Sequence, residues 1–280
     1  MKALALGLVV AAGAAAVVVA PDGAERPTAA RPGAGTAFPA LAAAVSAATA
    51  DRQDFPVIPL DGRFVMARIY FDAGGGGFGG FRRRGGGGDP PWHHDYPYAE
   101  QNFTQILREL TYVNPYTEGG NVFRLDDPLF MSYPIAYMSE PGFWVPSDEE
   151  AAGLRTYLEK GGFVIFDDFG FEHMYNLVEQ MRRVLPELQF VQLRPDADVF
   201  DSFFLIDITT IVLPSYRGGN IEFWGIFEDN DPDKRLMAVA GVNGDLGEFW
   251  EYSGTGFYPV DLSNEAYKVG VNYVMYALTH

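Results

Sequence analysis

The sequence predicts an α/β protein with a mostly parallel sheet and helices on both faces, a three-layer sandwich. Apolar runs of strand length alternate with amphipathic, helix-like segments through the middle of the chain, as in βαβ units. The run Phe163–Phe166 is apolar at every position, as expected of a central strand buried on both sides. A hydrophobic fraction of 48% is sufficient for a substantial core.

The N-terminal part differs in composition from the rest. Met1 and Lys2 precede small and apolar residues from Ala3 to Ala20, a pattern that fits a secretory signal peptide and approaches the length of a membrane anchor. We therefore interpret residues 1–20 as a signal peptide or a membrane anchor, and the Ala- and Pro-rich residues 21–55 as a flexible tether. A single domain is expected at 56–280, in the periplasm or secreted, with membrane anchoring by the N-terminal segment as the alternative.

Periodicity predicts the elements of the domain. Phe103, Ile106, Leu107 and Leu110 form one apolar helix face, with spacings of three and four residues. A capping box of Ser147 and Glu150 should open the next helix, which ends at Gly161-Gly162. Further helices are expected at about Phe171–Leu185 and after Ser263, the predicted cap of the last helix. The predicted strands are Phe64–Phe71, Asn121–Leu125, Pro134–Met138, Phe163–Phe166, Leu188–Leu193, Ile221–Phe227 and Leu236–Val242.

Charge and cysteine content exclude several function classes. The net charge of −17 and the pI near 4.5 argue against nucleic-acid binding, which needs excess Lys and Arg. The absence of cysteine excludes disulfides, thiolate metal sites, lipoprotein acylation and cysteine nucleophiles. No Gly-x-Ser-x-Gly elbow is present, so a serine hydrolase has no support.

Polar residues at predicted strand ends indicate the candidate site. In open α/β sheets the ligand crevice lies beyond the carboxyl ends of the strands. Asp72, Ser139-Glu140 and Asp167-Asp168 occupy such positions. Asp167 and Asp168 are also the candidates for a catalytic base or a metal ligand.

Asp167, Asp168, Glu172 and His173 lie within seven residues of one another. Clustered carboxylates can bind Ca²⁺ or Mg²⁺ or shift each other's pKa. Alternatively, Asp168 caps the following helix and Glu172 favours its N-terminal dipole. No cofactor is predicted, with Ca²⁺ or Mg²⁺ at these acids as the alternative.

Three other motifs have ordinary explanations. His93 and His94 are adjacent and should diverge, which favours a ligand-contacting loop with His94 over a zinc site. The Gly-rich loop 74–88 carries Arg82-Arg83-Arg84, of which Arg83 is a candidate anion ligand, although a solvated loop is the simpler interpretation. Asp229, Asp231 and Asp233 fail the later positions of a calcium loop and indicate a turn.

Several motifs occur together in a characteristic order. They are Asp95-Tyr96-Pro97, Asp127-Pro128, Tyr133-Pro134, Tyr137-Met138-Ser139-Glu140-Pro141-Gly142, Tyr157-Leu158-Glu159-Lys160-Gly161-Gly162-Phe163, Asp167-Asp168-Phe169, Asp245-Leu246-Gly247, Gly270-Val271-Asn272 and Tyr276-Ala277-Leu278-Thr279-His280. Over about Arg63 to His280 the chain resembles the bacterial domain-of-unknown-function family 4159. The resemblance implies a fold like that of class I glutamine amidotransferases, in the flavodoxin-like class, and an envelope location. Family members are often associated with von Willebrand A-type domains and MoxR-type ATPases, and the family has no settled activity.

The chain departs from its relatives at chemically important positions. Glutaminases carry cysteine where this strand leads to Asp167-Asp168, and a carboxylate cannot replace the thiolate without another mechanism. Family members tend to carry histidine in the segment matching Asp198 to Asp207, and before the residue matching Asn243, where this chain has Val242. Neither glutaminase activity nor a role for those histidines is expected here.

We therefore favour a non-catalytic domain that binds a ligand or partner at the strand-end crevice. The alternatives are a carboxylate- or metal-dependent hydrolase acting on an envelope glycan or peptide, and a structural assembly component. An envelope protein or a glycan is the expected partner, nucleic acid is not, and an oligomer is compatible with the sequence. The candidate ligand-binding residues are Asp72, Arg83, His94, Glu140, Asp167, Asp168 and His173.

Overall fold

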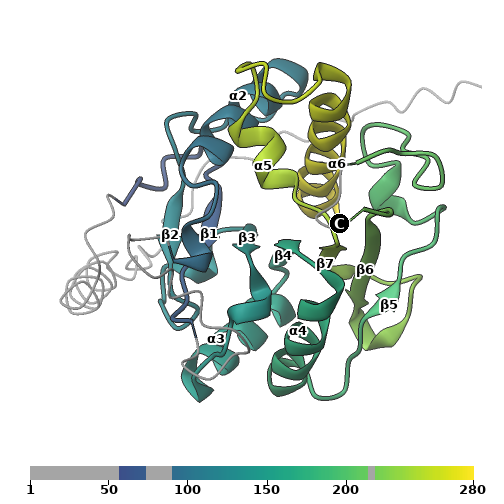
Figure 1. Ribbon diagram of the computed structural model, residues 1–280. Helices are drawn as coiled ribbons and strands as arrows, with labels where there is room; N and C mark the ends of the chain where they lie inside the picture. Colours follow the sequence, from purple (N-terminus) through teal and green to yellow (C-terminus); the bar gives the residue numbers. More distant parts are fainter. Residues whose placement is uncertain (1–56, 74–89, 214–217) are drawn as a thin grey trace, which may run out of the picture. The chain divides into compact units, whose positions relative to one another are not determined.

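The computed structural model describes residues 57–73, 90–213 and 218–280. A seven-stranded sheet with the order β2-β1-β3-β4-β7-β6-β5 runs through this part of the chain (Figure 1). The strands are β1 (Ala67–Ile69), β2 (Asn121–Phe123), β3 (Ile135–Ser139), β4 (Phe163–Phe169), β5 (Val191–Gln192), β6 (Glu222–Phe227) and β7 (Leu236–Val242).

The sheet is mostly parallel, as predicted. Strands β2, β1, β3, β4 and β7 pair in parallel, and β6 is antiparallel to both β7 and β5. The order 2-1-3-4 followed by β7 matches the doubly wound arrangement, in which ligands bind beyond the carboxyl ends of the strands.

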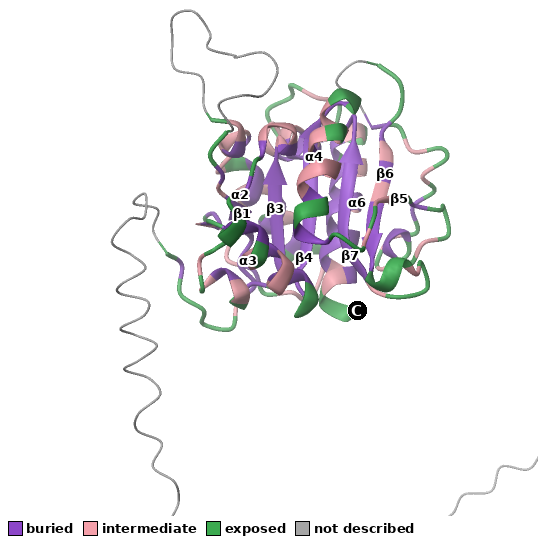
Figure 2. Ribbon diagram, turned by 90° about the horizontal axis from the view of Figure 1, so that it is seen from below, coloured by how far each residue is buried: buried purple, intermediate pink, exposed green. Residues whose placement is uncertain are grey.

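Helices cover both faces of the sheet. In Figure 1, α2 (Tyr98–Leu110), α5 (Leu246–Glu251) and α6 (Val260–Thr279) lie on one side, and α3 (Asp148–Glu159) and α4 (Phe171–Val184) on the other. Short 3-10 helices span Pro91–His93, Phe130–Ser132, Pro141–Phe143, Asp198–Phe200 and Glu228–Asn230. The central strands β3, β4 and β7 are buried along their length between these layers (Figure 2). The predicted three-layer α/β architecture is therefore confirmed.

One predicted helix cap is confirmed and another is wrong. The Ser147 hydroxyl accepts from the Glu150 amide at 3.1 Å, and the Glu150 carboxylate accepts from the Ser147 amide at 2.9 Å. Ser263, by contrast, is buried inside α6, which begins at Val260 after Pro259. The Ser263 amide already donates to the Pro259 carbonyl within the first turn, so the helix starts four residues earlier than predicted.

The Asp167-Asp168 segment differs from the predicted end of the strand at Phe166. Strand β4 continues to Phe169, and its register with β7 shifts between Phe166 and Phe169. Asp168 lies at this irregularity with φ 64°. Asp168 does not cap α4 either, since the residue before that helix is Gly170 and no side chain in the described part of the chain caps it. A β-bulge re-aims a side chain at a strand end without ending the strand, and that is its effect here.

Other differences concern length. Strands β1 and β5 are shorter than predicted because, among the described residues, continuous pairing is confined to Ala67–Ile69 and Val191–Gln192, and Phe64 forms only an isolated bridge with Pro115. No helix in the described ranges has the length and apolar character needed to cross a bilayer. The segment Met1–Ala20 lies outside those ranges.

Candidate functional site

Asp168 is held at the carboxyl end of β4 by two hydrogen bonds. Its Oδ2 lies 2.6 Å from Nδ1 of His94 and accepts from the Ser139 hydroxyl at 2.8 Å. Ser139 is the last residue of β3, the neighbouring strand, and both it and Asp168 are buried. Two adjacent strand ends therefore converge on one carboxylate.

His94 reaches this carboxylate from the segment that precedes α2. Its backbone carbonyl accepts from the Arg68 guanidinium at 2.8 Å, and Arg68 in turn pairs with Glu100 at 2.5 Å in the interior. The His94 side chain is 44% exposed, so the site is open to solvent on this side. The neighbouring His93 packs edge-on against the rings of Trp92 and Tyr96, so the two histidines diverge.

Asp95 is the least satisfied polar side chain at the site. It is 5% exposed overall, and neither carboxylate oxygen accepts a hydrogen bond from an N–H or O–H group of the described residues. Its Oδ1 lies 3.6 Å from Nδ1 of His94. The backbone of Asp95 is left-handed, with φ 63°, which turns its side chain towards the end of the sheet. A buried carboxylate without donors loses the hydration that stabilises its charge.

Asp245 approaches from the opposite side, between β7 and α5. It is the N-cap residue of α5, and its Oδ1 accepts from the Glu248 amide at 2.9 Å. The start of α5 is fixed in turn by Asp167, whose Oδ2 accepts from the amides of Leu246 at 2.7 Å and Gly247 at 3.0 Å. The Tyr137 hydroxyl donates to the same oxygen at 2.7 Å. Asp167 is thus buried beneath the site and holds the helix that carries Asp245.

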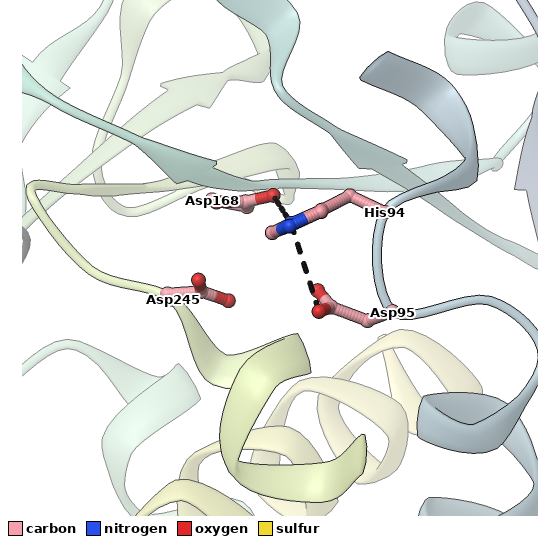
Figure 3. A group of neighbouring side chains, drawn as sticks. All are labelled: His94, Asp95, Asp168 and Asp245. Carbon is pink, nitrogen blue, oxygen red and sulfur yellow. Dashed lines mark hydrogen bonds and ion pairs between the residues drawn. The ribbon is translucent and has the colours of Figure 1, made fainter. Parts of the chain in front are cut away.

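His94, Asp95, Asp168 and Asp245 form a group that we call the strand-end cluster. One ligand atom from each of the four lies within 4.8 Å of the others. Figure 3 shows the Asp95 and Asp245 carboxylates and the His94 imidazole facing a common space beside Asp168. The four residues come from three separate segments, which the doubly wound sheet brings to one edge.

Burial and mutual repulsion shift the protonation equilibria of the cluster. Burial raises the pKa of Asp95 well above its usual value, and the charge of Asp168 raises it further. The same two causes raise the pKa of Asp245. The hydrogen bond to Asp168 raises the pKa of His94 to about 10, so the imidazole carries a positive charge. Burial and the Asp168 charge raise the pKa of the neighbouring Glu140 to about 7. Full ionisation of the three carboxyl groups would therefore exceed the single positive charge that His94 supplies.

The structure brings only part of the predicted site together. His94, Asp167, Asp168 and Glu140 lie at the same end of the sheet, and Glu140 adopts a left-handed φ of 47° while its amide donates to the Asp167 carbonyl. Asp72 is an exposed residue that pairs with Arg124 at 3.0 Å and is not in the strand-end cluster. His173 packs edge-on against Phe143, and Arg83 lies outside the described residues.

The sequence interpretation missed Asp95 and Asp245. Both stand in motifs that carried the family resemblance, but neither follows a predicted strand directly. Asp95 comes after a long loop and Asp245 three residues after β7, at the start of a helix of six residues. A usable signal was the position of Asp245 before Leu246, Gly247 and Glu248, which is an Asp helix cap.

The remaining sequence motifs take structural roles. Asp229 pairs with Lys234, and Asp231 accepts from the Asp233 amide in a turn, in agreement with the interpretation of this segment as a turn. Among the adjacent aromatic residues Phe223-Trp224 and Phe249-Trp250, Phe223, Phe249 and Trp250 are buried.

One protein family matches the chain. The model described as "Domain of unknown function (DUF4159)" covers residues 83–278, well over half of the sequence. The chain belongs to this family. No curated protein matches the chain. DUF4159 is defined without an activity, and the whole strand-end cluster falls within the matched range, so the site geometry is the guide to function.

Proposed function

We propose that this DUF4159 domain binds a divalent cation through His94, Asp95, Asp168 and Asp245, and uses it to hold a ligand at the strand ends. The observation that carries the proposal is the Asp95 carboxylate, buried and directed into the cluster with no hydrogen-bond donor among the described residues. Acidic residues often gather on surfaces without binding an ion. A buried carboxylate that accepts no hydrogen bond from the described residues and lies beside two others is different, because its desolvation is costly unless a positive charge compensates it.

The positively charged groups of the described residues supply only part of that compensation. His94 is shared between Asp168 at 2.6 Å and Asp95 at 3.6 Å, and Arg68 directs its short contact to Glu100 instead. A cation among the four side chains would replace the proton on His94 Nδ1 and give both Asp95 and Asp245 a partner. Metal ligands must be deprotonated, so ion binding and proton loss are coupled in such sites.

The donor set favours particular ions. Imidazole suits Zn²⁺ and related ions, whereas carboxylates suit Mg²⁺, Ca²⁺ and Mn²⁺. Ligand atoms on opposite sides of an ion lie about 4.2–4.8 Å apart when the bonds are about 2.1–2.4 Å. The 4.8 Å limit within the cluster is compatible with such an ion after small side-chain movements. Mn²⁺ and Zn²⁺ are therefore expected to bind more tightly than Mg²⁺ or Ca²⁺.

The cation would give a non-catalytic domain a means of binding an oxygen-rich ligand. Free coordination positions on the solvent side of His94 could take carboxylate or hydroxyl oxygens, such as those of an envelope glycan. The apolar run Ala3–Ala20 after Lys2 supports export to the envelope as part of this proposal. Cell fractionation of the tagged full-length protein tests the location, and a purely cytoplasmic protein would contradict it.

Cation binding can be measured by thermal unfolding and calorimetry of the full-length chain. With Mn²⁺ at about 100 times its Kd, the free energy of unfolding should rise by about 2.7 kcal/mol. Asp168→Asn and Asp245→Asn should each remove most of this stabilisation. Asp72→Asn is the matched control, because Asp72 follows a strand but lies outside the cluster, and it should leave the stabilisation intact. The proposal would be overturned if the wild type were stabilised by none of Mn²⁺, Zn²⁺, Mg²⁺ and Ca²⁺. It would also be overturned if Asp168→Asn and Asp245→Asn were stabilised as much as the wild type.

Glu140 favours hydrolysis as a second candidate function. A half-buried carboxyl with a pKa of about 7 beside a cation site has the properties of a general acid or base. In that case a cation-bound water would be the nucleophile and an envelope glycan or peptide the substrate. Glu140→Gln should abolish turnover and keep cation binding. If the cation-loaded wild type does not hydrolyse peptidoglycan fragments, hydrolysis is excluded and ligand binding is the proposed function that stands.

A further inference from the structure

Asp95 belongs to a second group of acidic side chains. Its carboxylate lies within 4.8 Å of ligand atoms of Glu248 and Glu251, both on α5. This second group shares only Asp95 with the strand-end cluster. One buried carboxylate therefore connects two sets of potential cation ligands.

The two oxygens of Asp95 face different neighbours. Oδ1 lies 3.6 Å from Nδ1 of His94, within the strand-end cluster. Oδ2 lies against α5, since a methyl group built on Gly247 would come within 2.4 Å of it. Within the described part of the chain, neither oxygen accepts a hydrogen bond from an N–H or O–H group. Oδ1 therefore has the His94 imidazole as its neighbour, and Oδ2 has α5.

Helix α5 presents Glu248 and Glu251 together. The two residues are three positions apart, so they lie on one face of the helix. The Tyr258 hydroxyl donates to Glu248 Oε1 at 2.7 Å and so orients that side chain. Both glutamates are partly buried, and burial together with the Glu248 charge raises the pKa of Glu251. This face of the helix is therefore directed, in part, towards Asp95.

We infer that a second divalent cation binds between Asp95, Glu248 and Glu251, with Asp95 bridging the two ions. The inference rests on the proposed function, because the bridge needs the first ion in the strand-end cluster. Carboxylate-bridged ion pairs about 3.5–4 Å apart occur in two-metal sites, where the ions share the charge of the bridging group. The second position has only oxygen donors, which favours Mn²⁺, Mg²⁺ or Ca²⁺ over Zn²⁺.

The competing arrangement is a proton shared between Asp95 and Glu251. Two carboxylates can hydrogen-bond only when one of them is protonated, and burial of Asp95 favours its neutral form. Such a pair would occupy the second position without a metal ion. The number of bound ions distinguishes the two arrangements.

Mn²⁺ serves as the probe for both positions. Equilibrium dialysis of the full-length protein at saturating Mn²⁺ should give two ions per chain, and electron paramagnetic resonance should show the exchange coupling of two nearby Mn²⁺ ions. Glu251→Gln and Glu248→Gln should each reduce the number to one and remove the coupling. The exposed Glu109→Gln on α2 is the control and should keep both ions. Circular dichroism verifies that each variant is folded, and Glu251→Ala provides a second variant at that position.

The outcomes separate the two proposals. If the wild type binds a single Mn²⁺ that Asp168→Asn removes and Glu251→Gln does not, the second ion is excluded and the proposed function stands. If the wild type binds no Mn²⁺, the proposed function fails and the bridging role of Asp95 fails with it. Two ions that persist in both glutamate variants would overturn the assignment of Glu248 and Glu251.

Discussion

The guanidinium of Arg68 donates a hydrogen bond of 2.8 Å to the main-chain carbonyl of His94. Arg68 is fully buried, pairs with Glu100 and lies over the Tyr137 ring at 4.7 Å. It thereby connects the interior of β1 to the segment that carries His94 and Asp95. The position of the site depends on a buried ion pair beneath it.

Arg68→Met should destabilise the protein by about 3–5 kcal/mol, because it leaves the buried Glu100 carboxylate without its partner. The double variant Arg68→Met with Glu100→Gln should recover part of this loss. Urea unfolding at equilibrium gives the free energies. Both variants should also bind Mn²⁺ more weakly, since the His94 carbonyl loses its donor.

The control is the exposed pair of Arg108 and Glu109, with 3.3 Å between Nη2 and Oε1. Arg108→Met should cost less than about 1 kcal/mol, as exposed ion pairs usually do. If Arg68→Met were as mild as Arg108→Met, the buried pair would not organise the site.

Asp168→Asn should lower the pKa of His94 from about 10 towards its ordinary value. The Asp168 hydrogen bond is the main cause of the raised pKa, and the neutral amide removes both that acceptor and its charge. In the wild type, the His94 pairing adds stability that is complete below about pH 6.5 and is lost as the pH rises through about 10. NMR titration of the imidazole in metal-free protein measures the change. Asp72→Asn should leave the titration unchanged, and a His94 pKa still near 10 in Asp168→Asn would contradict the assignment.

Glu140→Gln should stabilise the metal-free protein at pH 8 and have little effect near pH 4.5. Burial, with the Asp168 charge, raises the pKa of Glu140 from 4.5 to about 7, so its ionisation opposes folding. Stability due to its neutral form is present below about pH 4.5 and is lost as the pH rises through about 7. Thermal unfolding at several pH values in the presence of EDTA tests this. A difference between variant and wild type that did not change with pH would point to a different cause.

Gly247→Ala should weaken Mn²⁺ binding and lower stability together. The added methyl would come within 2.4 Å of Asp95 Oδ2 and 2.6 Å of the Tyr137 hydroxyl, so Asp95 must move. Gly241→Ala on β7 is a milder matched change, because the nearest atoms would be 3.3 and 3.4 Å away. Calorimetric titration with Mn²⁺ and thermal unfolding compare the two. If Gly247→Ala bound Mn²⁺ with unchanged affinity, Asp95 Oδ2 would not take part in cation binding.

Local pattern predicted the layers of this fold well. The apolar Phe163–Phe166 run and the Ser147 capping box depend on neighbours within a few residues, and both are found where expected. The end of β4 was predicted less well, since the bulge at Asp168 depends on pairing with β7, which is distant in sequence. The prediction that Ser263 caps the last helix was wrong for a related reason, because α6 already begins at Val260, after Pro259.

The candidate site could be predicted only in part. Asp167 and Asp168 directly follow a recognisable strand, so their position at the sheet edge was predictable. Asp245 and Asp95 reach the same edge through a short helix and a long connection, whose paths depend on tertiary contacts such as that of Arg68 with His94. The adjacent residues Asp167 and Asp168 also have different partners. Asp167 accepts a hydrogen bond from the first residue of α5, whereas Asp168 is hydrogen-bonded to His94.

The left-handed backbone at Asp95, Glu140 and Asp168 has an evolutionary consequence. Residues other than glycine are strained at such φ angles, and here three acidic residues adopt them near one another. Lineages that no longer need the site would be free to drift to glycine at these positions and gain stability. Glycine at the matching positions of other DUF4159 proteins would then mark members that have kept the architecture and abandoned the site.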